Sequence, residues 1–345
     1  MAYCTLFNSN YLDKGIAMIE SLLNNSPTEH LYVLCMDETC KVILDDYFSG
    51  KVATISLEEF EDEDLLRVKP TRSVGEYCWT CTAKLIKYVL INFDEHVCTY
   101  VDSDLYFYSD PKCLIDEMIS HNCTVQLVSH NFNSTSKGRR LEKESGKNCV
   151  QFNTFTNEER SRDLLDLWIR QCINECSMKT AGDQGYTSDW GEKDFVNISS
   201  NSGAGVAPWN VDRFKMVNKQ KIYDRTNKRQ YDLIFYHFQG VINRDRYFVT
   251  IEPLLYYLII DKKLVFSLYY EYLKKTEEIK SIMEKRYGIL PIVNVYISDS
   301  HTNYTMFQRI KESLHLPMSL LLEKVLYRVL EIIRAKKAIV DVRKL

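Results

Sequence analysis

Short apolar runs alternate with segments of helical periodicity in the N-terminal part of the chain. Residues 2–7 and 31–36 are apolar runs of strand length, and residues 13–23 between them carry apolar side chains at helical spacing. Strand, helix and strand in this order predict a βαβ unit, whose crossover joins two parallel strands. A helix over residues 82–93 and a strand over residues 97–101 continue the pattern. We therefore expect an α/β fold with a mainly parallel sheet flanked by helices.

The rest of the chain continues this alternation. Residues 124–129 and 233–238 are apolar runs that predict strands, while residues 158–176 and 265–282 have the spacing of helices. Residues 132–149 are polar and rich in lysine and arginine, which predicts a loop. Such a loop is either simply solvated or serves as a lid over a bound ligand.

The C-terminal residues differ from the segments before them. After Pro317, apolar side chains recur on a helical period, and basic residues outnumber acidic ones. This pattern predicts a basic amphipathic helix. Two interpretations stay open: the helix lies on an anionic membrane surface, or it packs on the domain or on a second subunit.

Composition narrows the class of protein. A chain of 345 residues that is 45% hydrophobic and 26% charged can bury a substantial core. A net charge of -3 argues against general nucleic-acid binding, which requires a basic excess. No signal-like N-terminal segment is evident, and no apolar run reaches the ~18 residues of a membrane span. We expect a cytoplasmic protein.

The cysteines predict reduced thiols rather than a disulfide framework. Eleven of them, an odd number, are scattered along the chain. The pairs Cys78 and Cys81, and Cys172 and Cys176, have short spacings that suggest a shared metal ion. Each pair lies in a helix-like pattern without glycine or proline, so buried thiols are the favoured interpretation.

Two carboxylates follow the apolar run at residues 97–101. On an extended chain residues i and i+2 point the same way, so Asp102 and Asp104 can face one divalent cation. A second Asp-x-Asp, formed by Asp62 and Asp64, lies in an acidic run with no strand before it, and we interpret it as a solvated face or a helix start. Open α/β sheets bind ligands beyond the carboxyl ends of their strands, which favours the first pair as a metal site.

Six short segments, taken together and in their order along the chain, resemble the motifs of a known family. They are residues 3–12, 76–82, 99–111, 182–184, 207–210 and 236–240. In this set the chain resembles the nucleotide-diphospho-sugar glycosyltransferases of the GT-A fold, including a group of bacterial sugar transferases and, more distantly, glycosyltransferase family 8. The resemblance implies a Rossmann-like GT-A domain, placed at residues 1–250, and a helical C-terminal region at residues 251–345 that ends in the basic helix.

The resemblance implies where the nucleotide of the donor binds. Family 8 enzymes have an Asn-Tyr pair after the first strand, and Asn10 and Tyr11 match it. Phe7 and Asn8 belong to the same strand end. The face of a tyrosine ring can stack on any flat base, so Tyr11 is the expected base contact.

The resemblance also implies the ligands of the cation. In family 8 both Asp-x-Asp carboxylates and the histidine of a His-x-x-Gly motif bind the ion; here these are Asp102, Asp104 and His237, with Gly240 ending the motif and Ser103 between the carboxylates. An imidazole ligand beside carboxylates favours Mn²⁺ over Mg²⁺.

The transferred sugar has its own matches. Asp183 and Gln184 correspond to the Asp-Gln pair that family 8 places beside the sugar, and Asn153 and Lys84 fall where that family has donor-sugar or phosphate contacts. If the reaction inverts the anomeric carbon, a carboxylate base is needed, a role open to Asp183 or Asp189.

The resemblance fails at one motif. Family 8 continues to a Lys-Pro-Trp that contacts the phosphates, whereas this chain has Asn-Arg-Asp-Arg at residues 243–246. The candidates for the positive charge that this lysine supplies in family 8 are Lys84, Arg244, Arg246 and the basic segment at residues 132–149.

The function that the resemblance implies is metal-dependent transfer of a hexose-type sugar from a UDP-sugar to a glycan or a lipid-linked saccharide, as in surface polysaccharide synthesis. The basic helix would then contact the inner membrane from the cytoplasmic side. A sugar-nucleotide nucleotidyltransferase, a metal-dependent hydrolase and a non-catalytic carbohydrate-binding protein remain the alternatives.

Overall fold

The computed structural model describes residues 1–133, 136–218, 220–243, 248–250, 261–289 and 339–342. The predicted amphipathic helix after Pro317, and the candidate cations Arg244 and Arg246, lie outside the described residues. The proposed boundary at residue 250 therefore stays a prediction.

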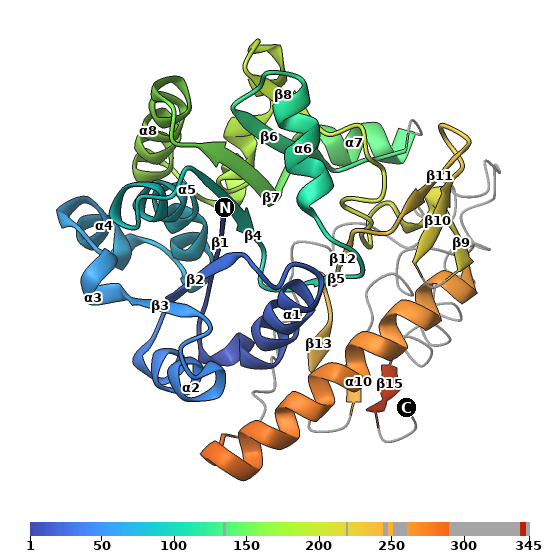
Figure 1. Ribbon diagram of the computed structural model, residues 1–345, viewed down its shortest axis with the longest axis horizontal. Helices are drawn as coiled ribbons and strands as arrows, with labels where there is room; N and C mark the ends of the chain where they lie inside the picture. The colour runs from blue at the N-terminus through green and yellow to red at the C-terminus, as the bar shows by residue number, and fades with distance from the viewer. Residues whose placement is uncertain (134–135, 219, 244–247, 251–260, 290–338, 343–345) are drawn as a thin grey trace, which may run out of the picture.

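A seven-stranded sheet forms the centre of the molecule (Figure 1), in the order β3-β2-β1-β4-β7-β6-β8. Its strands are β1 (Ala2–Phe7), β2 (His30–Cys35), β3 (Ala53–Ser56), β4 (Val97–Val101), β6 (Val125–Ser129), β7 (Asn148–Thr156) and β8 (Val196–Ile198). The strands β1 to β4 are mutually parallel, and β6 is parallel to β8, whereas β7 runs antiparallel to both of its neighbours. This mainly parallel, mixed sheet flanked by helices confirms the fold class predicted from the sequence.

Helices cover both faces of the sheet. They are α1 (Leu12–Asn25), α2 (Glu38–Phe48), α3 (Leu57–Phe60), α4 (Glu63–Val68), α5 (Val74–Asn92), α6 (Lys112–Ser120), α7 (Ser136–Ser145), α8 (Glu159–Asn174) and α10 (Lys262–Tyr287). One hydrophobic core contains side chains of α1, α2 and α6, and a second contains those of α5 and α8. Along β2, Val33 packs into the first core, while Tyr32 and Leu34 pack into the second, as expected for a strand buried on both faces.

Smaller elements surround this sheet. The strands β5 (Leu105–Phe107) and β12 (Phe235–His237) form an antiparallel pair, β9 (Phe214–Asn218), β10 (Lys221–Asp224) and β11 (Arg229–Asp232) form a meander, and β13 (Ile242–Asn243), β14 (Phe248–Thr250) and β15 (Ile339–Asp341) form a third sheet. Single 3₁₀ turns are η1 (Ser9–Tyr11), η2 (Lys69–Thr71), η3 (Met178–Thr180), η4 (Gln184–Thr187), η5 (Trp190–Glu192) and η6 (Val211–Arg213).

Two helices differ from the sequence prediction. The helix expected at residues 82–93 begins earlier, at Val74, because Ser73 and Glu76 form a capping box at its N-terminus. The prediction of a loop at residues 132–149 is wrong, because this segment contains α7 and the start of β7. Its polar sequence has no apolar stripe, and the ion pair between Arg140 and Glu144, four residues apart, supports the helix instead.

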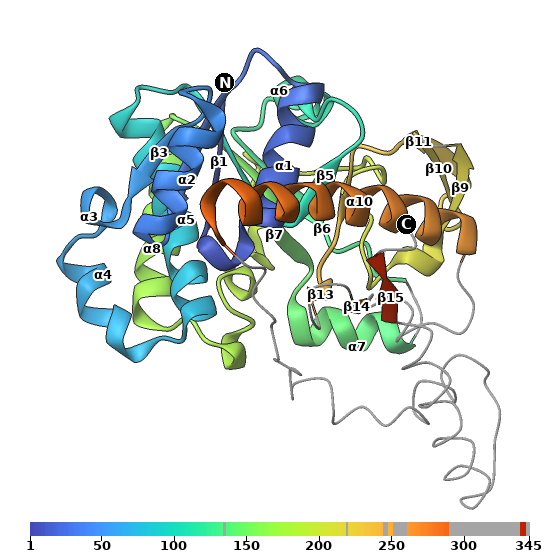
Figure 2. The ribbon, with the colours of Figure 1, turned by 90° about the horizontal axis from the view of Figure 1, so that it is seen from below.

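The long helix α10 lies against α1 (Figures 1 and 2). Near its start, a carboxylate oxygen of Asp261 accepts a hydrogen bond from the backbone of Met216 in β9, at 3.2 Å. Near its end, Arg286 and Tyr287 both contact Asp46 of α2 at 2.7 Å. None of the described helices is long and apolar enough to cross a membrane.

Candidate metal centre

Strand pairing brings the predicted cation ligands together. The chain leaves β4 at Val101, and the turn of Asp102, Ser103 and Asp104 leads into β5. The strand β12 pairs antiparallel with β5, and its His237 lies opposite Leu105, the residue after Asp104. Backbone hydrogen bonds hold the turn, from Asp102 N–H to the Gln151 carbonyl at 3.0 Å and from Phe238 N–H to the Asp104 carbonyl at 2.9 Å. The register of two short strands therefore sets the site.

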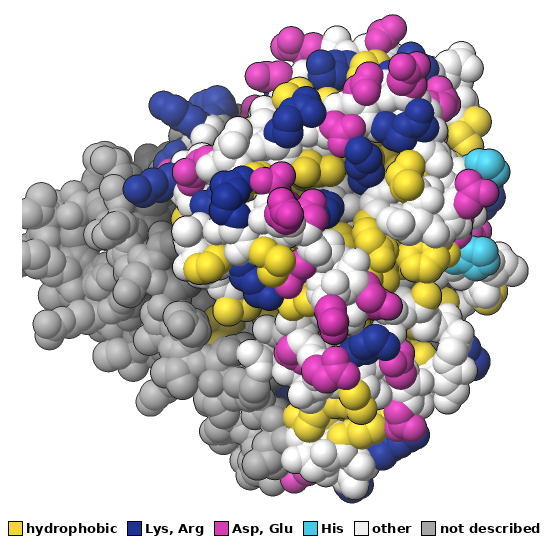
Figure 3. All heavy atoms as spheres, turned by 90° about the vertical axis from the view of Figure 1, so that its left-hand side faces the viewer, with side chains coloured by type: hydrophobic (Ala, Val, Ile, Leu, Met, Phe, Trp, Pro, Cys, Tyr) yellow, Lys and Arg dark blue, Asp and Glu magenta, His cyan; other side chains and the backbone are white. Residues whose placement is uncertain are grey.

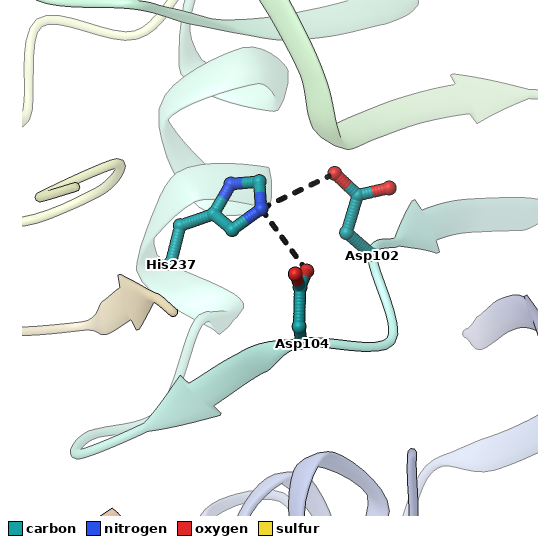
Figure 4. Close-up of side chains that lie close together, drawn as sticks. All are labelled: Asp102, Asp104 and His237. Carbon is teal, nitrogen blue, oxygen red and sulfur yellow. Dashed lines mark ion pairs between the residues drawn. The ribbon is translucent and has the colours of Figure 1, made fainter. Parts of the chain in front are cut away.

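The three side chains converge (Figure 4). The Nε2 atom of His237 lies 3.0 Å from Oδ1 of Asp104 and 3.9 Å from Oδ2 of Asp102. One ligand atom from each residue lies within 4.8 Å of the others. The imidazole is nearly buried, whereas the two carboxylates are partly open to solvent. Two oxygens and one nitrogen at this spacing form a donor set that suits a divalent cation.

A contact at the ring nitrogen that does not face the carboxylates fixes the orientation of His237. Its Nδ1 atom lies 2.8 Å from the side-chain oxygen of Gln151 in β7. Because that oxygen only accepts, Nδ1 carries the hydrogen, and Nε2 is the nitrogen that faces the carboxylates. The ring of Trp209 packs edge-on against the imidazole, with ring centroids 5.1 Å apart. Sequence reasoning missed Gln151, since nothing in its local sequence distinguishes it.

The carboxylates beside His237 favour the protonated form of its imidazole by raising its pKa. Burial would lower the pKa of His237, but attraction to Asp104 and the hydrogen bond with it raise this pKa well above its ordinary value. Burial would raise the pKa of Asp104, but the charge of His237 holds it below its usual range. The pKa of Asp102 is raised to about 7, mainly by burial, with His237 opposing and Asp104 adding to the shift. A cation binding here would compete with the proton on His237.

Buried polar atoms without partners lie on the β7 side of the site. Within the described part of the chain, neither side-chain amide atom of Asn153 has a hydrogen-bond partner, and neither does Oδ2 of Asp183. Asn153 pairs with Tyr100 across the β4–β7 ladder, two residues before Asp102. Burial, followed by the negative charges of Cys176 and Asp102, raises the pKa of Asp183 well above its ordinary value. Unpartnered buried groups of this kind cost about 1–3 kcal/mol each, a penalty that a polar ligand would relieve.

Gln184, a predicted sugar contact, and Asp189, a predicted candidate base, are less enclosed than Asp183. Gln184, at the start of η4, is only half-buried. The backbone carbonyl of its neighbour Asp183 accepts a hydrogen bond from the Trp168 indole at 3.0 Å, which fixes this turn. Asp189 is exposed at the start of η5, so it has none of the burial that shifts Asp183.

The predicted nucleotide contacts follow β1. Phe7 is buried at the end of the strand, and the side chain of Asn8 caps η1 by accepting a hydrogen bond from Asn10 N–H at 3.1 Å. Asn10 is exposed, and the ring of Tyr11 is 36% exposed. A tyrosine this exposed at the carboxyl end of the first strand is accessible to a planar ligand.

Lys14 is a second residue that sequence reasoning missed. Its Nζ atom lies 4.4 Å from the centroid of the Tyr11 ring. After burial and the larger effect of His237, its charge also contributes to the lowered pKa of Asp104. The available signal was its spacing, because residues three apart on a helix share a face, so Lys14 follows Tyr11 on the same side.

Lys84, the predicted sugar or phosphate contact, pairs with Asp62 in the structure. Its Nζ atom contacts Asp62 at 2.5 Å, and both residues line a hollow of 310 Å³ with Lys87 and Asp166 between α4, α5 and α8. None of the three cation ligands lines this hollow. On the face of the molecule that Figure 3 shows, basic and acidic side chains are intermixed.

The second Asp-x-Asp has the structure predicted for it. Asp62 caps α4 by accepting a hydrogen bond from Leu65 N–H at 3.0 Å, and Asp64 pairs with Arg67 at 2.8 Å. All eleven cysteines are free thiols in the structure. The motif Gly240 follows β12 in a turn with φ of 76°, a backbone angle that favours glycine.

Comparisons with known proteins place these features in context. No protein-family model matches the chain. It is 30% identical over 248 residues to YfnD, an uncharacterized protein of Bacillus subtilis, covering 69% of this chain and 77% of YfnD. It is 28% identical over 252 residues to YfnF of the same organism, covering 69% of this chain and 81% of YfnF.

The chain is also similar to solved structures of glycosyltransferases. The galactosyltransferase LgtC, in complex with donor and acceptor sugar analogues, is 15% identical with a TM-score of 0.45, over 70% of this chain and 87% of that chain. Mouse xyloside xylosyltransferase 1 is 11% identical with a TM-score of 0.44, over 69% of this chain and 98% of that chain. The sequence identity to YfnD over most of its length shows that this chain belongs to the same protein family as YfnD of Bacillus subtilis.

Proposed function

We propose that the protein is a metal-dependent glycosyltransferase that moves a hexose-type sugar from a nucleoside diphosphate sugar, UDP-linked, to a glycan or lipid-linked saccharide. The observation that carries this proposal is the convergence of Asp102, Asp104 and His237 at the carboxyl edge of the sheet. A ring open for stacking lies at the neighbouring strand end, and unpartnered polar atoms lie along β7.

The donor atoms fit a divalent cation with a preference for Mn²⁺, because imidazole nitrogen suits the softer ion. Asp102, Asp104 and His237 would hold it. When bound, such an ion neutralises the charge that develops on a leaving diphosphate. Gln151 keeps the Nε2 atom of His237 directed at the two carboxylates, and so preserves the ligand set between turnovers.

The residues around the cation site have proposed roles in binding the donor. Tyr11 would stack on the base, with Asn10 beside it. Asn153 and Asp183 would bind hydroxyls of the transferred sugar, which would satisfy their buried polar atoms. The raised pKa of Asp183, caused first by burial, favours its neutral form, which can donate a hydrogen bond as well as accept one. Gln184 would lie near the anomeric carbon.

The stereochemical course follows from the same proposal. Retention of configuration is expected from the resemblance to family 8, with the leaving phosphate helping to deprotonate the acceptor. The proton NMR spectrum of the product linkage distinguishes retention from inversion. An inverted configuration in the product would instead indicate a mechanism that needs a carboxylate base.

The proposed setting is the cytoplasm, in surface polysaccharide synthesis, with an acceptor carried on the inner membrane. The contact would be made by the basic helix predicted after Pro317. Flotation of the full chain and of a chain ending at residue 316 on vesicles containing phosphatidylglycerol tests this contact. Equal flotation of both chains would remove it.

The experiment that tests the function is a screen of sugar nucleotides for hydrolysis and for thermal stabilisation, with Mn²⁺ and with EDTA. We expect one donor class to be hydrolysed slowly in Mn²⁺ alone. A carbohydrate-binding protein would bind its ligand equally well in EDTA, and a nucleotidyltransferase would release pyrophosphate from a nucleoside triphosphate instead. Either of these outcomes would contradict the proposal.

A further inference from the structure

Lys14 has a buried side chain, and its ammonium has no anionic partner in the part of the chain that the structure describes. It lies in the first turn of α1 and is 7% exposed. Among the residues that the structure describes, its Nζ atom makes no ion pair and no hydrogen bond, and its contact is with the Tyr11 ring. The Nζ atom itself is not fully buried, so the ammonium reaches solvent while the hydrocarbon stem of the side chain is buried. A residue in this condition points to a negatively charged ligand.

The carboxylate of Asp13, the residue before Lys14, pairs with other groups. Oδ2 of Asp13 lies 3.6 Å from Nζ of Lys280 in α10 and accepts a hydrogen bond from the Asn243 amide at 3.4 Å. Lys280 in turn donates to the Asn243 side-chain oxygen at 2.7 Å. Asp13, Asn243 and Lys280 form a closed buried network with balanced charge. Asp13 therefore does not compensate the positive charge of Lys14.

Lys14 links the two ends of the proposed donor site. Its ammonium contacts the ring of Tyr11, the proposed base contact, and the strand β1 that leads into the turn of Tyr11 pairs with β4, which ends just before Asp102, a proposed cation ligand. In a nucleoside diphosphate sugar, the group that joins the nucleoside to the metal is the diphosphate. A cation at this position faces an anion of complementary charge.

We propose that Lys14 binds the diphosphate of the nucleotide-sugar donor from the α1 side, opposite the cation bound by the carboxylates. This inference rests on the proposed function, because it needs a nucleoside diphosphate in the site. It assigns the phosphate-binding charge to α1 rather than to Lys84, which pairs with Asp62.

The test compares UDP with uridine by calorimetry on the full chain in saturating Mn²⁺. We expect Lys14→Met to weaken UDP binding about ten- to hundredfold while uridine binding is unchanged, and Lys14→Arg to retain most of the UDP affinity. Lys112→Met, which removes an exposed lysine of α6 that pairs with Asp116, is the matched control and should bind UDP like wild type.

The outcomes separate the two proposals. If wild type binds neither UDP nor the guanosine, adenosine, cytidine and thymidine diphosphates, the proposed function fails, and this inference fails with it. If wild type binds and Lys14→Met binds equally well, only the role of Lys14 is overturned. Equal weakening of uridine and UDP would also overturn it, because Lys14 would then act through the Tyr11 ring. Thermal unfolding of Lys14→Met should show no loss of stability, and Lys14→Gln replaces it if the methionine variant does not fold.

Discussion

The side-chain oxygen of Gln151 lies 2.8 Å from Nδ1 of His237, on the side of the imidazole opposite the two carboxylates. Gln151 lies on β7, whose backbone also accepts the hydrogen bond from Asp102 at 3.0 Å. One residue of an antiparallel strand therefore positions both the histidine and the first carboxylate. This makes Gln151 a positioning residue for the metal centre.

Replacing Gln151 by leucine should weaken Mn²⁺ binding about 10- to 100-fold, because the imidazole loses the acceptor that orients it. Gln151→Glu keeps an acceptor at the same place and should retain most of the affinity. Calorimetric titration of the metal alone measures both. Identical Mn²⁺ affinity in wild type and Gln151→Leu would show that the contact is only structural.

Replacing Asp104 by asparagine should lower donor hydrolysis by about a hundredfold or more, since the cation loses a charged ligand. The second Asp-x-Asp supplies the matched control, because Asp64 is an exposed residue paired with Arg67. Asp64→Asn should hydrolyse the donor like wild type. The rate of UDP release in Mn²⁺ measures both variants, and wild-type turnover by Asp104→Asn would refute the metal assignment.

Mn²⁺ affinity should rise with pH. The cation binds neutral imidazole and ionised carboxylate, so a proton on His237 or Asp102 must leave first. Both pKa values are raised in the metal-free protein, that of Asp102 to about 7, so affinity should be weak in acid and should rise as pH passes through this value. Titrations between about pH 6 and pH 8 measure the trend. A flat profile would contradict this competition.

Replacing Tyr11 by alanine should cost about 1–3 kcal/mol of UDP binding, the range expected for loss of one base-stacking contact. Tyr11→Phe keeps the ring and should bind UDP nearly as wild type does. Pyrophosphate, which has no base, should bind equally well to all three proteins in Mn²⁺. A parallel loss of pyrophosphate binding in Tyr11→Ala would mean that the ring acts by holding Lys14.

The elements that could be predicted are those whose signal is local. The strand at residues 97–101 has the bounds predicted for it, and the helix around residues 265–282 is present, because apolar spacing alone indicates them. The helix α7 was missed because its sequence carries no apolar stripe. The antiparallel direction of β7 was also not predicted, since pairing between distant strands leaves no periodic mark in either of them.

The residues of the candidate site also divide into those with a local sequence signal and those without one. Asp102 and Asp104 were accessible because two carboxylates after a strand are a local pattern. His237 entered only through the resemblance, since its approach to Asp104 depends on the register between β12 and β5. Gln151 and Lys14 were missed because their roles depend on distant partners. Asp13, the residue before Lys14, pairs with the distant Lys280 of α10.

The buried network of Asp13, Asn243 and Lys280 joins residues on both sides of the predicted domain boundary at residue 250, next to the proposed donor site. A chain shortened before α10 would lose Lys280, and the carboxylate of Asp13 would then be buried without its cation. The free ammonium of Lys14 in the same helical turn would be the nearest available counter-charge. The helix α10 therefore neutralises the charge of Asp13 in the first turn of α1, and under the proposal above the charge of Lys14 would then remain available to the donor.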